Sequence, residues 1–169
     1  MINFRRIHTD EGPRLQAIRL RALADSPMAY GSTFAEEQLY SEAIWQERAA
    51  NGATGRNITI IVAESDGRLV GMATGLVSSL ETQAKFRPIM VGVFVDSTVR
   101  RQGVGVALIE KVIEWARARE STHLDAWITS GNDPAIALYS RCGFQATGAT
   151  RPNAHTSTLV EFEMTRNLE

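Results

Sequence analysis

Two arginines and two glycines stand between an apolar run and a helical pattern near the middle of the chain. The residues of this turn are Arg100, Arg101, Gln102, Gly103, Val104, Gly105 and Val106. Amides at a helix start have no acceptor within the helix, and the helix dipole favours an anion there. Glycine lets a phosphate approach the backbone, and arginine adds charge beside it. The turn therefore predicts a phosphate site, unless the glycines serve only tight packing.

A dinucleotide-binding turn is a second interpretation of the same glycines. That fingerprint needs a third glycine, where this chain has Leu108. Asp125 lies near the distance of a ribose-binding acid, but at the start of its predicted strand rather than the end. The turn also follows a hairpin instead of a first strand. No Gly-Lys-Ser/Thr sequence is present, which excludes a P-loop.

A second motif further along reads N-x-x-A-x-x-L-Y-x-x-x-G-F. Its residues are Asn132, Ala135, Leu138, Tyr139, Gly143 and Phe144. Asn132, followed by Asp133 and Pro134, predicts a helix start, and Gly143 predicts its end. Together the two motifs resemble the GNAT superfamily of N-acetyltransferases. The resemblance covers residues 58–146, and the element order extends it over the whole chain.

The resemblance implies a role for each of these residues. The amides of 101–106 would bind the pyrophosphate of acetyl-CoA, the cosubstrate, and Asn132 would also contact it. The strand end at Val93, Phe94 and Val95 would pair with the pantetheine arm and polarise the thioester carbonyl. Tyr139 would protonate the departing thiolate, although an aromatic residue on a short helix is otherwise core. Gly92 would form the bulge that splays the sheet, or is an ordinary strand glycine.

The general base is not assigned by the motifs. Some relatives carry a glutamate where this chain has Trp127. Glu36, Glu37 or a bound water are candidates, and the two glutamates are otherwise interpreted as solvated surface groups. His155 falls in a region that often lines the acceptor pocket, and is otherwise a surface histidine. A strong base is unnecessary for an α-amine of pKa about 8, because about a tenth of it is neutral at pH 7.

Composition limits the class of protein. The 169 residues, 44% hydrophobic and 22% charged, suit a single domain over residues 1–169. A net charge of −1 gives no pull toward nucleic acid or membrane. The single cysteine, Cys142, fits a reducing compartment, and we expect a cytoplasmic protein without a signal peptide or membrane span. His8, His123 and His155 are too scattered for a metal site.

The pattern along the chain predicts a mixed α/β fold. Strands are expected at 2–7, 57–63, 69–76, 89–95, 124–129, from 144 onward, and at 158–165. Helices are expected between 13 and 25, at 41–50 with Ile44 and Trp45 inward, at 104–119 and at 133–141. Residues 28–38 are expected as an irregular loop, which Tyr30 and Phe34 either pin to the core or turn toward substrate, and 81–88 as a polar connection. The central sheet should be mostly antiparallel, splayed at its central strand, with helices on both faces and parallel crossovers only through the last two helices.

These residues predict an enzyme, an acetyl-CoA-dependent N-acetyltransferase. It would move acetyl to a primary amine of a small molecule or peptide by direct attack on the thioester. The alternatives are a non-catalytic CoA- or acyl-CoA-binding module and a Rossmann-type nucleotide binder. The sequence does not identify the acceptor, and it allows a monomer or a homodimer.

Overall fold

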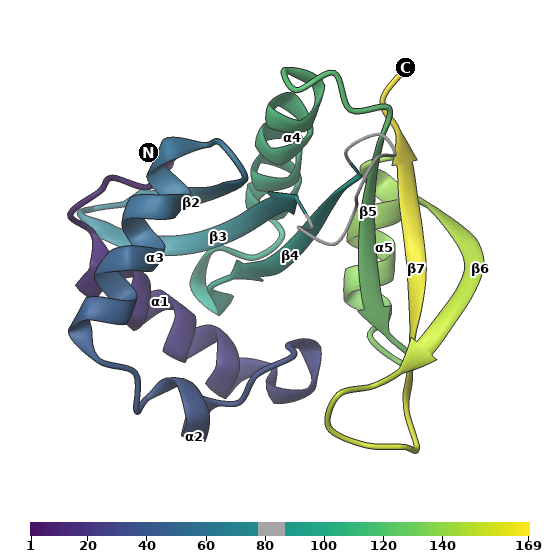
Figure 1. Ribbon diagram of the computed structural model, residues 1–169, viewed down its shortest axis with the longest axis horizontal. Helices are drawn as coiled ribbons and strands as arrows, with labels where there is room; N and C mark the ends of the chain where they lie inside the picture. Colours follow the sequence, from purple (N-terminus) through teal and green to yellow (C-terminus); the bar gives the residue numbers. More distant parts are fainter. Residues whose placement is uncertain (78–86) are drawn as a thin grey trace.

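The computed structural model describes residues 1–77 and 87–169, which form one sheet with helices on both faces (Figure 1). The seven strands are β1 (Asn3–Arg6), β2 (Ile58–Ser65), β3 (Arg68–Val77), β4 (Pro88–Val95), β5 (His123–Thr129), β6 (Gln145–Pro152) and β7 (Val160–Asn167). Their order across the sheet is β1-β2-β3-β4-β5-β7-β6. Only the β4–β5 pair is parallel. The mixed, mostly antiparallel sheet expected from the sequence is confirmed.

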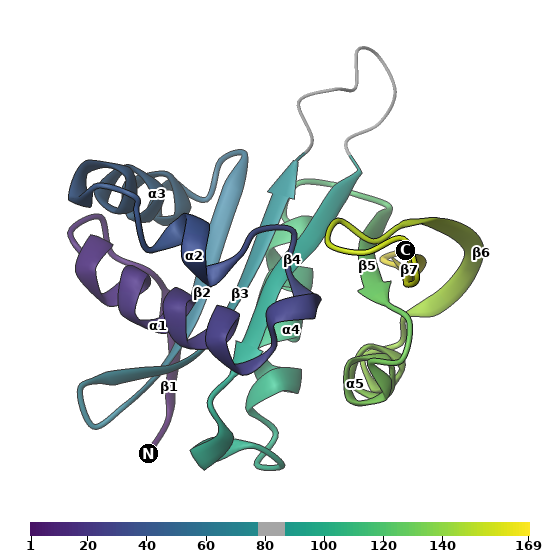
Figure 2. The same cartoon turned by 90° about the horizontal axis from the view of Figure 1, so that it is seen from below.

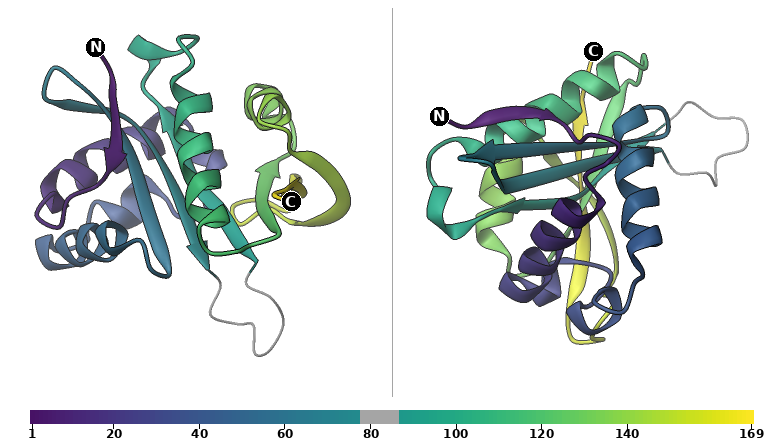
Figure 3. Two further views of the ribbon diagram at one scale, coloured as in Figure 1. Left: turned by 90° about the horizontal axis from the view of Figure 1, so that it is seen from above. Right: turned by 90° about the vertical axis from the view of Figure 1, so that its left-hand side faces the viewer.

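The helices divide between the two faces of the sheet (Figure 3). They are α1 (Gly12–Asp25), α2 (Phe34–Glu37), α3 (Glu42–Thr54), α4 (Val104–Arg117) and α5 (Asp133–Arg141), with 3₁₀ turns η1 (Pro27–Ala29) and η2 (Ser97–Val99). α1 and α3 bury their apolar side chains on one face, and α4 and α5 on the other. None of the helices in the described ranges has the length and apolar character needed to cross a membrane.

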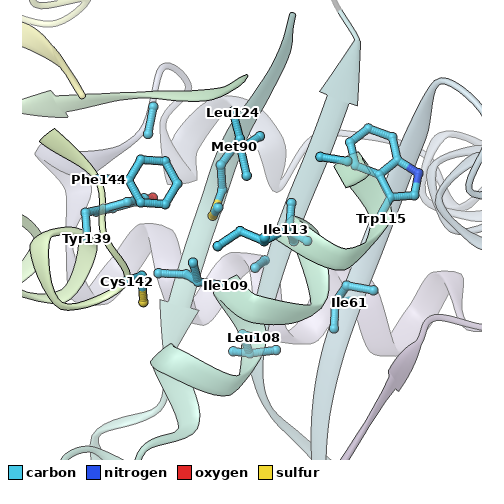
Figure 4. Packing of buried hydrophobic residues seen from close by; sticks show 14 of the residues in the cluster. Ile61, Met90, Leu108, Ile109, Ile113, Trp115, Leu124, Tyr139, Cys142 and Phe144 are labelled. Carbon is cyan, nitrogen blue, oxygen red and sulfur yellow. The ribbon is translucent and has the colours of Figure 1, made fainter. Parts of the chain in front are cut away.

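The core on the α4 face depends on the apolar stripe of that helix (Figure 4). Leu108, Ile109, Val112 and Ile113 recur at helical spacing and are fully buried. They pack on β2, β3 and β4, while Tyr139 and its neighbours on α5 extend the same cluster toward β5. Burying four aliphatic side chains at about 1.5–3 kcal/mol each makes α4 a principal support of the central strands.

Two predictions about connections are corrected, the first by a long-range strand pairing and the second by a local helix cap. The crossover through α5 does leave β6 parallel to β5, but β7 lies between them and pairs antiparallel with both. Residues 28–38 are not irregular throughout, because Thr33 and Glu36 form a reciprocal capping box that starts the one-turn helix α2.

The predicted helix at 41–50 begins where expected, but its end and one of its two inward residues differ from the prediction. Ser41 caps it, but it continues to Thr54 and ends at Gly55, whose φ is +64°. Trp45 is buried as predicted, whereas Ile44 is 39% exposed, which corrects that part of the prediction. The predicted polar connection at 81–88 falls mostly outside the described residues, and Pro88 already begins β4.

Gly92 forms the bulge that the sequence suggested. Its φ is +62°, and the register against β3 shifts so that Gly92 and Val93 together oppose Ala73. On the other side, β4 pairs with β5 only at Ile89 and Met90. The two strands therefore separate from the bulge onward (Figure 2).

Candidate active site

A cavity of about 1140 Å³ lies where β4 and β5 separate. Its walls come from β4, the start of α4, the end of β5, α5, and the segment between α1 and α2. The residues predicted to bind cofactor or act in catalysis line it, with one exception: Val93, Phe94, Val95, Arg100, Arg101, Gly103, Val104, Gly105, Val106, Asn132 and Tyr139. The exception is Gln102, whose side chain donates to the Thr98 carbonyl at 3.4 Å.

The open edge of β4 presents backbone groups to this cavity. The Asp96 amide donates to Val70 on β3 at 2.8 Å, so alternation along the strand turns the backbone groups of Val93 and Val95 the other way, toward the open edge. The Val93 carbonyl accepts from the Tyr30 hydroxyl at 3.1 Å, and the Val95 carbonyl accepts from Arg100 Nε at 2.9 Å. Phe94 instead buries its side chain against the α1 face.

The start of α4 supplies a second set of backbone donors. The first intrahelical bond runs from the Ala107 amide to the Gly103 carbonyl at 3.0 Å, so the four preceding amides have no acceptor inside the helix. Gly103 is the N-cap and provides no side-chain cap. Arg101 and Gly103 both have positive φ, +62° and +80°. Left-handed residues of this kind curl the amides into a concave anion-binding turn.

The two glycines have different functions in the fold. Gly103 has open space around it, so its positive φ is what favours glycine. A Cβ on Gly105 would lie 3.0 Å from Leu138 Cδ2 on α5 and 3.6 Å from Val95 Cγ2. Tight packing, the alternative considered from the sequence, therefore applies to Gly105, and it brings the helix start into contact with the open strand.

The two arginines of the turn differ in whether an acidic side chain compensates their charge. Arg100 pairs with Asp25 at 2.7 Å in addition to its bond to Val95. Arg101 is exposed, and no acidic partner faces it within the described part of the chain. A paired guanidinium contributes less net attraction to a phosphate than an unpaired one. Arg101 is thus the stronger candidate for charge recognition.

Tyr139 is both a core residue and part of the cavity wall. Its ring is buried and packs edge-on against Phe144, with centroids 5.2 Å apart (Figure 4). The same residue lines the cavity. Burial raises the pKa of the Tyr139 phenol well above its ordinary 10. The hydroxyl therefore stays protonated at neutral pH and can act as a hydrogen-bond donor.

Asn132 begins α5 as predicted. Its Oδ1 accepts from the Ala135 amide at 3.4 Å, which is an N-cap bond. Because the cap position lies on the cavity wall, the residue that starts the helix also faces the open edge of β4.

Neither glutamate considered as a general base is available in the cavity. Glu36 is exposed and accepts from the Thr33 amide at 2.9 Å in the capping box, which lowers its pKa. Glu37 is buried rather than solvated, which corrects that expectation. It pairs with Arg19 at 2.8 Å and with Arg48 at 3.1 Å. Burial alone would raise the Glu37 pKa, but these two arginines outweigh it and lower the pKa.

The cavity wall is strongly cationic. Six arginines line it: Arg19, Arg48, Arg100, Arg101, Arg141 and Arg151. The two carboxylates of the described lining, Asp25 and Glu161, are each paired, with Arg100 at 2.7 Å and with Arg151 at 2.6 Å. Six arginines against two carboxylates favour anionic ligands.

Hydrogen bonds connect β5 and the β6–β7 loop to the segment between α1 and α2. His155, on the β6–β7 loop, donates from Nε2 to the Tyr30 carbonyl, and Thr129 donates to the Met28 carbonyl at 3.1 Å. Asn153 is bonded to Thr129 in turn. His155 is therefore half-buried and engaged, unlike the surface histidine that the sequence favoured.

Arg19 and Arg48 are cavity residues that sequence reasoning missed. Arg19 lies one helical turn after Leu15 and beside Ile18, on the apolar stripe of α1. An arginine on an apolar stripe indicates a buried ion pair, because a buried guanidinium group requires an acidic partner. Its partner, Glu37, lies on another element and could not be identified from spacing.

Comparison with known proteins agrees with this geometry. The model of the acetyltransferase (GNAT) family matches residues 19–144. The L-amino acid N-acetyltransferase AaaT of Escherichia coli is 31% identical over 121 residues, which is 68% of each chain. The uncharacterized N-acetyltransferase MJ1207 of Methanocaldococcus jannaschii is 42% identical over 53 residues, 31% of this chain, and the match spans only 24% of that relative.

A solved structure shares the fold over the full chain. The yncA protein from Salmonella typhimurium, solved with its cofactor acetyl-CoA, superposes with a TM-score of 0.80 at 18% identity. The match covers 100% of this chain and 95% of that one. At this identity the likeness concerns the fold alone.

Replacing Glu37 with Gln tests the buried ion pair. We expect Glu37→Gln to lower the free energy of unfolding at pH 7 by about 3 kcal/mol, because Arg19 is left half-buried without its partner. The folded-state pKa of Glu37 lies below its unfolded value, so the pairing stabilises above that value and is lost as pH falls through the folded pKa. Denaturant unfolding at pH 7 and in acid should show a deficit that shrinks on acidification. The control is Glu47→Gln, an exposed change on the same helix as Arg48; a Glu37→Gln deficit no larger than the control's would refute the pairing.

Proposed function

The chain belongs to the acetyltransferase (GNAT) family, and from this premise we propose that it is an acetyl-CoA-dependent N-acetyltransferase that acts on a primary amine. The observation that carries the proposal is a juxtaposition in one cavity. The uncapped start of α4 and the open edge of β4 meet there, with Gly105 in packing distance of Val95. One end offers amides and charge for a pyrophosphate, and the other offers strand backbone for an amide-containing arm.

Acetyl-CoA, when bound, would supply an activated thioester to the amine. The amides of 101–106 would hold the pyrophosphate, with the Arg101 and Arg100 side chains adding charge. The backbone of Val93, Phe94 and Val95 would orient the pantetheine arm, and Asn132 would contact it from α5. The fit is supported by the unpaired amides of the α4 start, which require an acceptor from outside the helix.

Tyr139 is proposed to assist departure of the CoA sulfur. A phenol of ordinary pKa about 10 gives its proton to a thiolate, whose conjugate thiol has a pKa of about 8.5, at a cost of about 2 kcal/mol. Burial raises the Tyr139 pKa further, which makes full transfer costlier still. Tyr139 therefore acts as a neutral hydrogen-bond donor to the sulfur as negative charge develops there, and solvent completes protonation.

No carboxylate base is assigned to the acceptor. The described lining holds Asp25 and Glu161, and both are occupied by arginine. We propose that the amine enters neutral and loses its second proton to a bound water. An amine of pKa about 8 is a tenth neutral at pH 7, whereas a lysine side chain at about 10.4 is neutral once in about 2,500 molecules. A lysine side chain is disfavoured as the acceptor on this ground.

We also propose that residues 1–169 work as one acetyltransferase domain, in the cytoplasm, as a monomer or homodimer. Pairing of β1 with β2 and of β7 with β5 ties both ends of the chain into one sheet, which supports the single domain. Cys142, the single cysteine, is buried and reduced, in keeping with a reducing compartment.

The proposal is tested by incubating the protein with acetyl-CoA and a panel of primary amines. Free CoA is measured with a thiol reagent, and the acetylated product is identified by mass. Formation of both, in equal amounts, supports transfer. CoA binding without product across the panel would instead support the non-catalytic CoA-binding module, which the absence of an unpaired carboxylate in the described lining makes the second candidate.

Arg101 and Arg100 should contribute unequally to cofactor affinity. We expect Arg101→Gln to raise the dissociation constant of acetyl-CoA on the order of tenfold and to flatten its salt dependence. Arg100→Gln should change it less than about threefold, because Nε and Nη2 of Arg100 already donate to Val95 and Asp25. Calorimetry at low and high salt gives both values. Arg117→Gln, an exposed change at the far end of α4, is the control, and a larger effect of Arg100→Gln than of Arg101→Gln would contradict the charge assignment.

Tyr139→Phe removes only the proposed hydrogen-bond donor. We expect kcat to fall about a hundredfold, the low end of general-acid effects, while acetyl-CoA affinity and melting temperature stay near wild type. An acyl donor with a better leaving thiol should show a smaller deficit. Tyr40→Phe, a half-buried tyrosine outside the cavity, is the matched control. Equal turnover of wild type and Tyr139→Phe with both donors would mean that Tyr139 is a core residue alone.

A further inference from the structure

We infer that the acceptor is an α-amino acid, and that Arg19 and Arg48 bind its carboxylate. This rests on the proposed function, and it adds the substrate class and the residues that select it. The residues concerned lie on α1 and α3, outside both sequence motifs.

Hydrogen bonds hold the guanidinium group of Arg19 in one orientation and leave one of its nitrogens without a partner. Its Nε and Nη2 both donate to Glu37, the latter at 2.8 Å, and its guanidinium lies 4.7 Å from the Tyr30 ring centroid. Among the described residues Nη1 has no hydrogen-bond partner. A Cβ built on Gly92 would lie 3.7 Å from this nitrogen. An oriented donor therefore faces the bulge of β4.

Arg48 approaches the same carboxylate from the other side. It donates from Nη1 to Glu37 at 3.1 Å and lies against the rings of Tyr40 and Trp45. Its Nε and Nη2 have no partner among the described residues. The cluster Arg19–Glu37–Arg48 thus holds two guanidinium groups and one buried carboxylate, and carries one surplus positive charge on the cavity wall.

Trp45 belongs to the same part of the wall and packs against Arg48, 5.1 Å from guanidinium carbon to ring centroid. Its indole Nε1 is buried and has no hydrogen-bond partner among the described residues. The donors available to the cavity are therefore the unengaged guanidinium nitrogens of Arg19 and Arg48, and an unbalanced guanidinium is costly. A ligand that brings acceptor atoms and about one negative charge is favoured here.

A carboxylate meets these requirements, and its position defines the acceptor. Guanidinium groups bind carboxylates through paired, oriented hydrogen bonds. The backbone of Val93 to Val95 is expected to polarise the thioester carbonyl, and Arg19 Nη1 borders Gly92, the residue before Val93. The amine and the carboxylate must therefore be close together in the acceptor. In an α-amino acid one carbon separates the two groups, whereas a polyamine or a peptide N-terminus has no carboxylate at that place.

The test compares L-amino acids with their carboxamides, which keep the amine and side chain and lose the negative charge. For at least one amino acid, wild-type kcat/KM should exceed that of its carboxamide by tenfold or more. Arg48→Gln should reduce this ratio to below threefold, by raising KM for the acid with kcat changed less than twofold. Arg56→Gln, an exposed arginine just after α3 and outside the cavity, should leave the ratio unchanged.

At Arg19 a more conservative substitution is needed, because its side chain belongs to a buried ion pair. Arg19→Lys retains the charge beside Glu37 and loses the second arm of the guanidinium, so the ratio should fall while the melting temperature stays near wild type. Carboxamides that react as well as the acids, or a ratio that Arg48→Gln leaves intact, would overturn the inference while leaving acetyl transfer established.

Failure of transfer itself is separated by a binding measurement. Equilibrium dialysis of the CoA-saturated protein against the twenty common L-amino acids and their carboxamides needs no turnover. Retention of an acid over its carboxamide, lost in Arg48→Gln, supports the carboxylate site even if no product forms. Equal retention of acids and carboxamides overturns it.

Discussion

A β-bulge at Gly92 turns the backbone of β4 away from β5, and the hydrogen-bonding groups that follow lose their strand partner on that side. Buried backbone groups must be satisfied, so the chain brings other donors to them. The Tyr30 hydroxyl reaches Val93 from the α1–α2 segment, and Arg100 reaches Val95 from the turn before α4. The two segments that supply these donors therefore also form part of the cavity wall.

The same opening determines where charge collects. Asp25 and Glu161 are each held by an arginine, and Glu37 is buried between two, so the described carboxylates near the cavity are all neutralised. Arg101 is left in surplus at one end and the Arg19–Glu37–Arg48 cluster at the other. A cavity with a positive region at each end suits a phosphate-bearing donor and a carboxylate-bearing acceptor that meet at the middle of β4.

Sequence predicted the parts of this site that local signals specify. The Asn132 cap and the helix end at Gly143, whose φ is +80°, each depend on residues within a few positions of one another. The placement of β7 between β5 and β6, and the burial of Glu37, depend on partners far away in sequence. The capping box at Thr33 is different, because its signal is local: Thr33 and Glu36 stand three residues apart, the spacing of a capping box.

The positive charge of the cavity wall also affects the pKa of the acceptor amine, which has no carboxylate base beside it. A like charge nearby disfavours the ammonium form of an amine and lowers its pKa, and each unit of lowering makes the neutral form about ten times more abundant while it remains scarce. A carboxylate bound at Arg19 and Arg48 would cancel part of that field. The remaining wall charge raises the neutral fraction of the amine but takes up no proton itself. The proton released on acetyl transfer therefore goes to the bound water, and the charge on the wall lowers the need for a carboxylate beside the amine.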